Sequence, residues 1–288
     1  MPDPGFPVPC FVMKYRGKNY LFDAGENSQT QLARYGISRV KISNIMVSHM
    51  HGDHTLGLPG ILIRRGQEGS VEPLGVFGPY GLDKYIYSTQ KYLQYRLHYE
   101  LNYTRCENGQ TYDLGEIKLT VCRLNHRLET YGFVLRAVKK KRKFYPEKAL
   151  RLEIPQGPLW GKLQNNHSVR LEDGREITPQ QVSDPPPPGP SVAYITDTRP
   201  IFNYPEEFHD VDLLIHEAMF LHREKEEARQ KYHSTAIEAA RVARELGAKQ
   251  LLLTHFSRRY DSPELLADEA AKIFPQVKSA RPGLQIPI

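Results

Sequence analysis

The chain has 288 residues, of which 40% are hydrophobic and 25% are charged, the composition of a globular protein with a sizeable core. No apolar run approaches the roughly 18 residues of a membrane span, and Met1-Pro2-Asp3-Pro4 does not resemble the start of a signal peptide, so we expect a cytoplasmic protein without a membrane segment. Its three cysteines lack C-x-x-C spacing, which argues against a disulfide framework or a thiolate zinc knuckle. The net charge of +6 permits a polyanionic partner.

The first elements are a hairpin and a short helix. Residues 11–15 and 20–22 predict two strands, and a helix is expected from Gln29 to Tyr35. Asp23 follows the second strand, where it is either a plain turn residue or a carboxylate that orients a ligand imidazole. The next apolar run, Ile45-Met46-Val47, is a buried strand.

That strand leads into Ser48-His49-Met50-His51-Gly52-Asp53-His54-Thr55, which has three imidazoles and a carboxylate in six positions. In an extended segment His49 and His51 point the same way, because side chains alternate with a period of two. Asp53 and His54 fall on the turn into the next helix, expected over Leu56–Ile63, and can face a second ion. The alternative is an exposed loop with chance histidines, but this pattern has a coordination rationale and no packing rationale.

A strand at 74–77, a Gly-Pro-Tyr-Gly turn and a helix at 82–95 follow. The alternating segment Glu116–Leu124 predicts a half-buried strand that delivers His126. A single histidine at a strand end is often structural, yet His126 can supply the third ligand that His49 and His51 need.

The segment from Ala137 to Pro190 differs in character. It contains a basic run at 139–143, the stretch Gly157-Pro158-Leu159-Trp160-Gly161-Lys162, and a proline-rich end. Its few hydrophobic positions and lack of a sustained period predict a segment without its own core, which is typical of a linker, a disordered insertion or a functional projection.

Three further strands are expected, and two of them lead to candidate site residues. The strand at 192–195 leads to Asp197, whose two carboxylate oxygens can bridge two metals. The strand at 211–215 ends on His216-Glu217-Ala218, and the strand at 251–253 exposes His255. Before the last strand, Thr235 and Glu238 form a capping box for a helix that ends at Gly247.

The H-x-H-x-D-H motif resembles that of the metallo-β-lactamase fold superfamily. The later segments H-E-A, H-S-T-A and L-L-L-T-H-F-S-x-R-Y, with the Gly-Pro segment at 157–162, resemble those of the ribonuclease Z family within it. The resemblance runs from about Tyr20 to Phe274, whereas the proline-rich opening lacks the family's usual strand and L-G-T-G turn. It implies an α/β fold, a four-layer αββα sandwich formed by one domain over 1–288, with 137–190 as an inserted substrate-binding arm.

The metal assignment follows from these residues and the resemblance. His49, His51 and His126 are expected to hold one ion, Asp53, His54 and His255 a second, and Asp197 to bridge them. Two zinc ions are expected, and manganese is a further possibility because nitrogen and oxygen ligands accept both.

The resemblance also implies the reaction. Asp53 orients the attacking nucleophile, and His233 protonates or stabilises the leaving 3′ oxygen; the alternative for His233 is a structural residue at a helix start. The reaction would remove the 3′ trailer of precursor tRNA, leaving a 3′-hydroxyl on the tRNA and a 5′-phosphate on the trailer.

The substrate-binding residues expected are Lys139, Lys140, Lys141, Arg142, Lys143, Gly157, Pro158, Lys162 and Arg259. A homodimer is usual in the family and is expected here. Hydrolysis of a small ester, lactone or phosphodiester is the enzymatic alternative, although it leaves the basic segment unexplained. An RNA-binding protein with a vestigial site is a third hypothesis, against which the complete ligand set argues.

Overall fold

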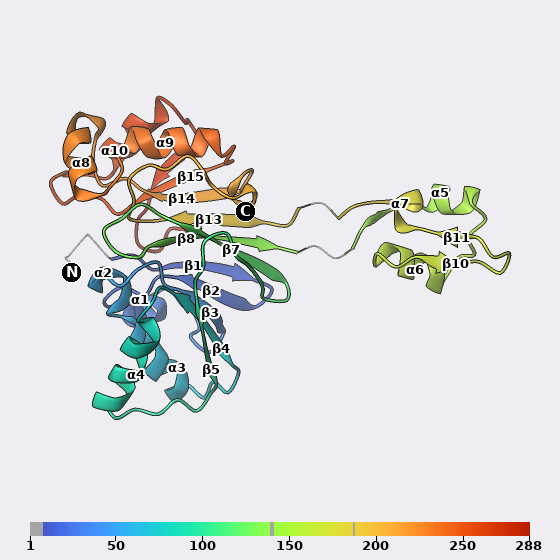
Figure 1. Cartoon of the computed structure of the whole chain (residues 1–288), viewed down its shortest axis with the longest axis horizontal. Coiled ribbons are helices and arrows are strands. Elements are labelled where there is room, and N and C mark those ends of the chain that lie inside the picture. Colours follow the sequence, from blue (N-terminus) through green and yellow to red (C-terminus); the bar gives the residue numbers. More distant parts are fainter. Residues whose placement is uncertain (1–7, 139–140, 187) are drawn as a thin grey trace. The chain divides into compact units, whose positions relative to one another are not determined.

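A computed structural model describes residues 8–138, 141–186 and 188–288 (Figure 1). The chain divides into two compact units. Unit 1 contains Met1–Tyr112, Leu119–Leu135 and Ser191–Ile288, and unit 2 contains Asp113–Lys118 and Arg136–Pro190. None of the described helices is both long and apolar enough to cross a membrane.

The first sheet has five strands in the order β1-β2-β3-β4-β5. Strand β1 (Phe11–Tyr15) pairs antiparallel with β2 (Lys18–Phe22), which confirms the predicted hairpin. Strands β3 (Ile42–Met46), β4 (Leu74–Gly78) and β5 (Leu101–Arg105) continue the sheet in parallel. The carboxyl ends of β2 and β3 therefore meet at one edge, where the predicted metal loop begins.

The second sheet has seven strands in the order β16-β15-β14-β13-β8-β7-β6. Strands β13 to β16 are parallel, so the residues that follow β13, β14 and β15 gather at one edge of this sheet too. The strands are β6 (Thr111–Asp113), β7 (Ile117–Arg123), β8 (Tyr131–Ala137), β13 (Ser191–Ile195), β14 (Leu213–Glu217), β15 (Leu251–Thr254) and β16 (Val277–Ser279).

Helices cover the outer face of each sheet, as Figure 1 shows. The five-stranded sheet buries its apolar side chains against α1 (Ser28–Arg34), α3 (Leu58–Gln67) and α4 (Leu82–Tyr92). The seven-stranded sheet does so against α9 (Ala236–Glu245) and α10 (Glu264–Ala271). The inner faces of the two sheets pack against each other, and the ring of Phe22 in β2 lies 5.3 Å from that of Tyr194 in β13 between centroids. The predicted four-layer αββα sandwich is confirmed.

The helix expected over Leu56–Ile63 is α3, which begins two residues later and continues to Gln67, and a separate short helix, α2 (Gly52–Thr55), precedes it. The backbone of Gly57 packs so closely on the loop after β2 that a Cβ there would lie 2.0 Å from the carbonyl oxygen of Gly25. This contact fixes the metal loop against the end of β2. The later helix α9 has the predicted capping box of Thr235 and its predicted end before Gly247.

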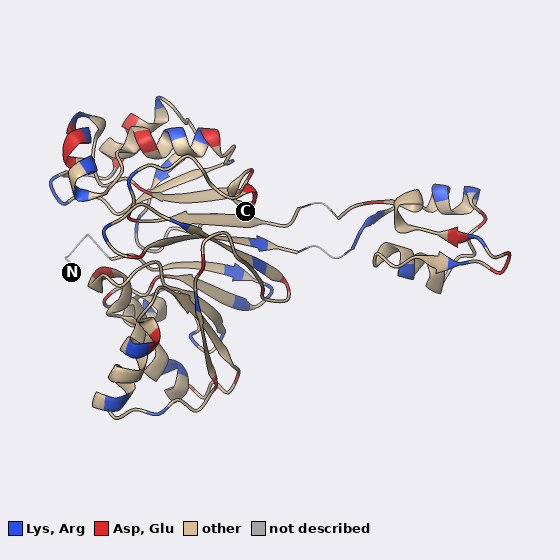
Figure 2. Ribbon diagram, in the orientation of Figure 1, with Lys and Arg blue, Asp and Glu red and all other residues tan. Residues whose placement is uncertain are grey.

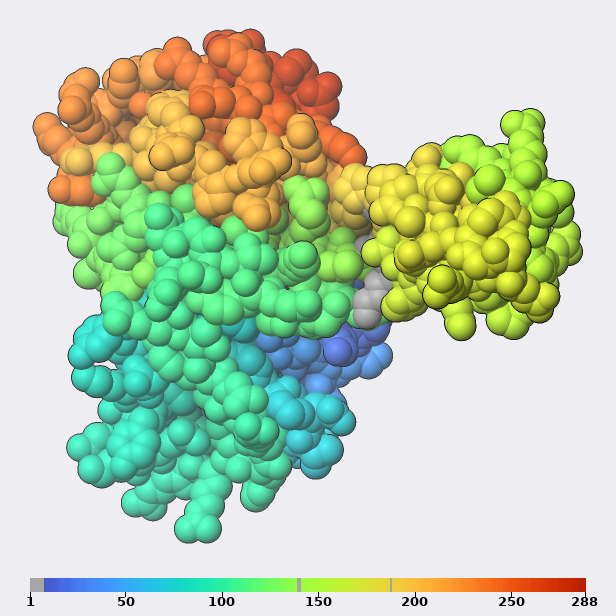
Figure 3. Space-filling model, turned by 45° about the vertical axis from the view of Figure 1, so that its right-hand side comes forward, coloured from blue at the N-terminus to red at the C-terminus, as the bar shows by residue number. Residues whose placement is uncertain are grey.

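Unit 2 corrects the prediction that residues 137–190 lack a core. Its helices α5 (Pro146–Arg151), α6 (Pro158–Gln164) and α7 (Pro179–Val182) enclose a small apolar cluster with two short β-ladders. One ladder pairs β9 (Lys143–Phe144) with β12 (Ser183–Asp184), and the other pairs β10 (Val169–Arg170) with β11 (Glu176–Ile177). Ala149, Ile154, Leu163, Val169, Leu171, Ile177 and Val182 form the buried part of that cluster. The space-filling view shows this unit as a body of packed side chains (Figure 3). The sequence pattern concealed the core because its members come from short, irregular elements.

Candidate metal centre

Asp23 supports the metal loop from the end of β2. Its buried carboxylate accepts hydrogen bonds from the Ser48 backbone N–H at 2.7 Å, the Ser48 hydroxyl at 2.9 Å and the Tyr194 hydroxyl at 2.6 Å. Nδ1 of His54 lies 2.6 Å from the same carboxylate, and Nδ1 of His49 lies 3.0 Å from the Ser48 hydroxyl. Since the Nδ1 atoms of His54 and His49 are engaged here, their Nε2 atoms are the ones left to face the centre.

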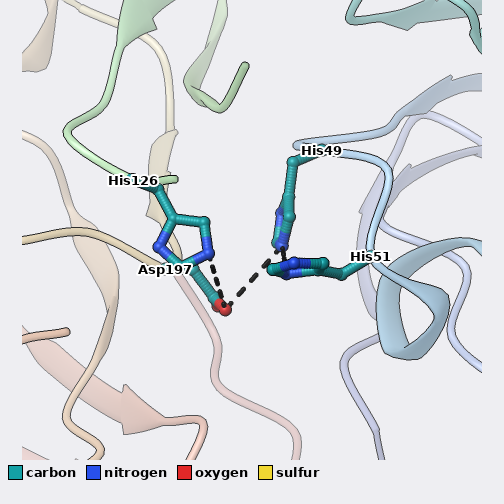
Figure 4. A group of neighbouring side chains, drawn as sticks. All are labelled: His49, His51, His126 and Asp197. Carbon is teal, nitrogen blue, oxygen red and sulfur yellow. Dashed lines mark hydrogen bonds and ion pairs between the residues drawn. The ribbon is translucent and has the colours of Figure 1, made fainter. Parts of the chain in front are cut away.

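One group of possible ligands consists of His49, His51, His126 and Asp197, whose ligand atoms all lie within 4.8 Å of one another (Figure 4). Nε2 of His49 is 3.8 Å and Nε2 of His126 is 4.0 Å from Oδ2 of Asp197. Nδ1 of His126 is held at 3.1 Å by the carbonyl oxygen of Tyr232.

A second group consists of Asp53, His54 and His255. Oδ2 of Asp53 lies 3.5 Å from Nε2 of His54 and 3.4 Å from Nε2 of His255. The other carboxylate oxygen of Asp197, Oδ1, lies 3.5 Å from Nε2 of His54 and 3.4 Å from Nε2 of His255. Asp197 thus turns one oxygen toward each group.

These side chains fit metal ions. Nε2 of His54 and Nε2 of His126 are buried and have no hydrogen-bond partner among the described residues, and both point toward Asp197. A buried polar atom without a partner is costly, and a cation among these atoms would remove that cost. The donor set of imidazoles and carboxylates is one that zinc prefers.

Electrostatics favours the same interpretation. Burial lowers the pKa of His49, His51 and His126, so these imidazoles are neutral and have lone pairs to offer. Burial also acts to lower the pKa of His54 and His255, but nearby carboxylates outweigh it, and the pKa of His255 rises to about 9. For Asp53 burial acts to raise the pKa, but hydrogen bonds from His255 and His54 lower it overall. Without a metal, protons on His54 and His255 balance the carboxylates; a bound cation would replace them.

His233 lies at the rim of the second group, 8% exposed, with its ring stacked on that of His255 at 5.3 Å between centroids. Its Nδ1 is 2.9 Å from Oε1 of Glu217. His233 also falls within a possible ligand group with Asp197 and His255, so geometry alone permits it to bind metal.

Glu217 is a site residue to which the sequence assigned no role. It ends β14, is fully buried, and accepts hydrogen bonds from the backbone N–H groups of Thr198 at 2.8 Å and Met219 at 3.2 Å. With the contact to His233, the carboxylate connects the loop of Asp197 to the candidate acid. Its signal in the sequence is the one used for Asp197, a carboxylate directly after an apolar strand.

The expected substrate-binding residues differ in their exposure and in their contacts. Lys141, Lys143 and Lys162 are exposed on unit 2, where Figure 2 marks several basic residues in blue on the ribbon. Gly157 has φ 127° and Pro158 opens α6. Arg142 is 7% exposed and donates hydrogen bonds to Ser183 and Asn166, so we assign it a structural role instead. Arg259 forms an ion pair with Glu227. Lys139 and Lys140 lie outside the described residues.

Solved structures and family models identify the class of this fold. The short form of human tRNase Z has a TM-score of 0.69 at 24% identity, covering 100% of this chain and 95% of that one. YhfI from Bacillus subtilis, a metallo-β-lactamase fold protein, has a TM-score of 0.64 at 20% identity, covering 99% and 93%. A beta-lactamase superfamily domain model matches residues 167–256, and the model for the anti-Pycsar protein Apyc1 matches residues 9–150. The protein has the metallo-β-lactamase fold with a metal site at the edge of its sandwich.

Sequence relatives narrow the class. Ribonuclease Z from Cyanothece sp. is 40% identical over 245 residues, which cover 85% of this chain and 77% of the relative. Ribonuclease Z from Thermosynechococcus vestitus is 39% identical over 279 residues, covering 95% and 68%. The chain belongs to the ribonuclease Z family, which confirms the resemblance seen in its sequence.

Proposed function

We propose that this protein is an endoribonuclease that removes the 3′ trailer of precursor tRNA, leaving a tRNA 3′-hydroxyl and a 5′-phosphate on the trailer. The observation that carries the proposal is the Asp197 carboxylate, which turns one oxygen to each of two histidine-containing groups. Metal-dependent phosphodiester cleavage commonly uses two ions that share such a bridge.

Two zinc ions would be held by the residues of the two groups. His49, His51 and His126 would bind one ion, Asp53, His54 and His255 the other, and Asp197 both. Bound zinc supplies Lewis-acid chemistry that neutralises the charge developing on a phosphodiester and activates water. Manganese could bind at the same site, because nitrogen and oxygen ligands accept both zinc and manganese.

The protein's own groups would position and transfer protons. Asp53 contacts His54 and His255 through Oδ2, and its side chain is 29% exposed, so it can accept a hydrogen bond from the attacking water. His233 donates from Nδ1 to Glu217, and its Nε2 can protonate the leaving 3′ oxygen. This assignment places Glu217 in a positioning role.

Unit 2 would be the arm that binds the tRNA. The exposed Lys141, Lys143 and Lys162 would contact phosphates, which position an RNA without reading its sequence. By analogy with the family, the protein would work as a homodimer in the cytoplasm.

An unprocessed tRNA transcript and a chromogenic phosphodiester, each with and without chelator, test the proposal. We expect chelator-sensitive cleavage of the transcript at the 3′ end of the tRNA, and about two zinc equivalents per chain. Hydrolysis of the chromogenic substrate with an intact transcript would favour the small-substrate hydrolase instead. A stoichiometry near one that persists on adding zinc would exclude the bridged site.

A further inference from the structure

Tyr232 ends helix α8 (Lys225–Lys231) in the left-handed backbone conformation, with φ 64° and ψ 40°. Glycine adopts this conformation most readily, because the Cβ of any other residue crowds the backbone there. The next residue is His233, the candidate acid. A tyrosine in a strained conformation thus lies beside the metal centre, and we ask which interaction of its side chain offsets the strain.

The backbone contact of Tyr232 with the site does not require a tyrosine side chain. Its carbonyl oxygen accepts a hydrogen bond from Nδ1 of His126 at 3.1 Å. Glycine offers the same carbonyl without the steric cost. The ring must therefore serve a separate purpose.

The ring is a platform for two arginines. Cζ of Arg199 lies 3.6 Å and Cζ of Arg127 lies 5.7 Å from the ring centroid of Tyr232. Both are cation–π distances. Nε of Arg199 also donates to the carbonyl oxygen of Arg229 at 2.7 Å, which fixes this guanidinium in place.

Most of the donors on these guanidinium groups remain available. Within residues 8–138, 141–186 and 188–288, neither Arg127 nor Arg199 forms an ion pair with a carboxylate, and the only side-chain hydrogen bond of the two is that from Nε of Arg199. Arg127 is exposed and Arg199 and Tyr232 are partly exposed. Two oriented guanidinium groups without an anion are suited to bind phosphate.

Their positions tie them to the reaction centre. Arg127 directly follows His126, Arg199 is two residues after Asp197, and Tyr232 directly precedes His233. The rings of His126 and Tyr232 are 6.4 Å apart between centroids and perpendicular. An RNA strand with its cleaved bond at the metals would therefore bring a neighbouring nucleotide to these three side chains.

We propose that Arg127, Arg199 and Tyr232 form a substrate clamp for the nucleotide next to the cleaved phosphodiester. The arginines bind its phosphate, and the Tyr232 ring holds them in orientation. This inference rests on the proposed function, because it takes single-stranded RNA as the ligand.

Substitutions separate the ring from the backbone. Tyr232→Gly relieves the strain and keeps the carbonyl that holds His126, whereas Tyr232→Phe keeps the ring. We expect Tyr232→Gly and Arg127→Gln to lower kcat/KM for a tRNA transcript at least about ten-fold more than for the chromogenic phosphodiester, mainly through KM. Tyr232→Phe should remain within about two-fold of the wild type, because the ring is kept.

The matched control is Arg123→Gln, which removes an exposed arginine of the same segment that contacts Glu129 and Tyr131 instead. It should leave both substrates unaffected. If Tyr232→Gly lowers both reactions equally or loses zinc, the tyrosine acts on the metal centre and the clamp is wrong. If it lowers neither, the ring has no role in binding.

A titration with a short fluorescent single-stranded oligoribonucleotide measures RNA binding without cleavage, so it tests the clamp independently of the proposed function. Arg127→Gln and Tyr232→Gly should weaken binding, and Arg127→Gln should reduce the dependence of log affinity on log salt by about 0.7. Unchanged binding would overturn the clamp whatever the cleavage assay gives. A wild-type protein that binds the RNA through the clamp but leaves the transcript intact would overturn the proposed function alone.

Discussion

Asp53 and His233 both contact His255 but through different interactions, and this difference separates their roles. Oδ2 of Asp53 lies 3.4 Å from Nε2 of His255, the distance of two ligands around one ion. His233 stacks its ring on that of His255 and turns Nδ1 to Glu217. These contacts support the proposed roles of Asp53 as a metal ligand and of His233 as the proton donor.

Asp53→Ala and His233→Ala are expected to reduce cleavage of precursor tRNA by about 100-fold or more, yet only Asp53→Ala should lose zinc. His233→Ala should affect a nitrophenyl phosphodiester less, because its leaving group needs no proton. Metal analysis and kinetics on both substrates test this. Loss of zinc from His233→Ala to the same extent would make it a ligand, as its distance to Asp197 permits.

Glu217→Gln tests the positioning role of that carboxylate. The amide cannot accept from Thr198, Met219 and His233 as the carboxylate does, so His233 loses its orientation. We expect an activity loss of about 10- to 100-fold on tRNA with zinc retained. In the Glu217→Gln, His233→Ala double variant the losses should not multiply, since both act through one proton transfer. Fully multiplicative losses would show that Glu217 acts independently of His233.

At the scale of elements, the site depends on the strand ends that meet at the edge of each sheet. Asp23 at the end of β2 is a buried non-glycine residue with φ 58°. Asparagine and aspartate tolerate this conformation better than other residues with side chains. Its carboxylate holds Ser48, His54 and Tyr194, and so joins the two sheets.

Asp23→Asn keeps the backbone conformation and removes the charge. We expect zinc affinity to fall by about 10- to 100-fold, mainly at the ion held by His54, because the imidazole loses its partner at Nδ1. Zinc titration with a competing chelator measures this. Asp210→Asn is the control, since Asp210 has a similar φ of 53° but is exposed and distant in sequence from the ligands. Equal zinc affinity in Asp23→Asn and the wild type would remove the supporting role.

At the scale of the whole molecule, unit 2, the proposed arm, has a core of its own and can be removed as a unit. Replacing residues 141–186 with a short glycine linker should spare hydrolysis of the chromogenic phosphodiester and strongly reduce cleavage of tRNA. Affinity for tRNA should fall steeply with salt in the full chain and less steeply in the deleted one, because each lost phosphate contact removes about 0.7–0.9 from the slope. Equal slopes would show that unit 2 binds no phosphate.

If the protein is a homodimer, the arm of one subunit can serve the metal centre of the other. Mixing an arm-deleted chain with an arm-intact Asp53→Ala chain, under conditions that exchange subunits, should restore tRNA cleavage above the sum of the two alone. Confirmed heterodimers with no such gain would mean that the arm works within its own subunit or not at all.

The sequence by itself determined the fold class and the candidate ligands. Four candidate ligands lie within six residues: His49, His51, Asp53 and His54. Residues this close in sequence stay close in space however the rest of the chain folds. Asp197 and His255 follow apolar strands, and parallel strands bring their carboxyl ends to one edge. Period and spacing were sufficient for the candidate ligands and for an α/β architecture, whereas the four-layer arrangement came from the family resemblance.

Only the tertiary structure decided what depends on long-range packing. The contact of Tyr194 with Asp23 and the contact of Glu217 with His233 join residues far apart in the chain. Arg142, part of a basic run, was expected to bind substrate, but it lies buried against Ser183. A sequence pattern records which residues are charged or apolar, whereas burial and partners are set by chain segments that meet only after folding.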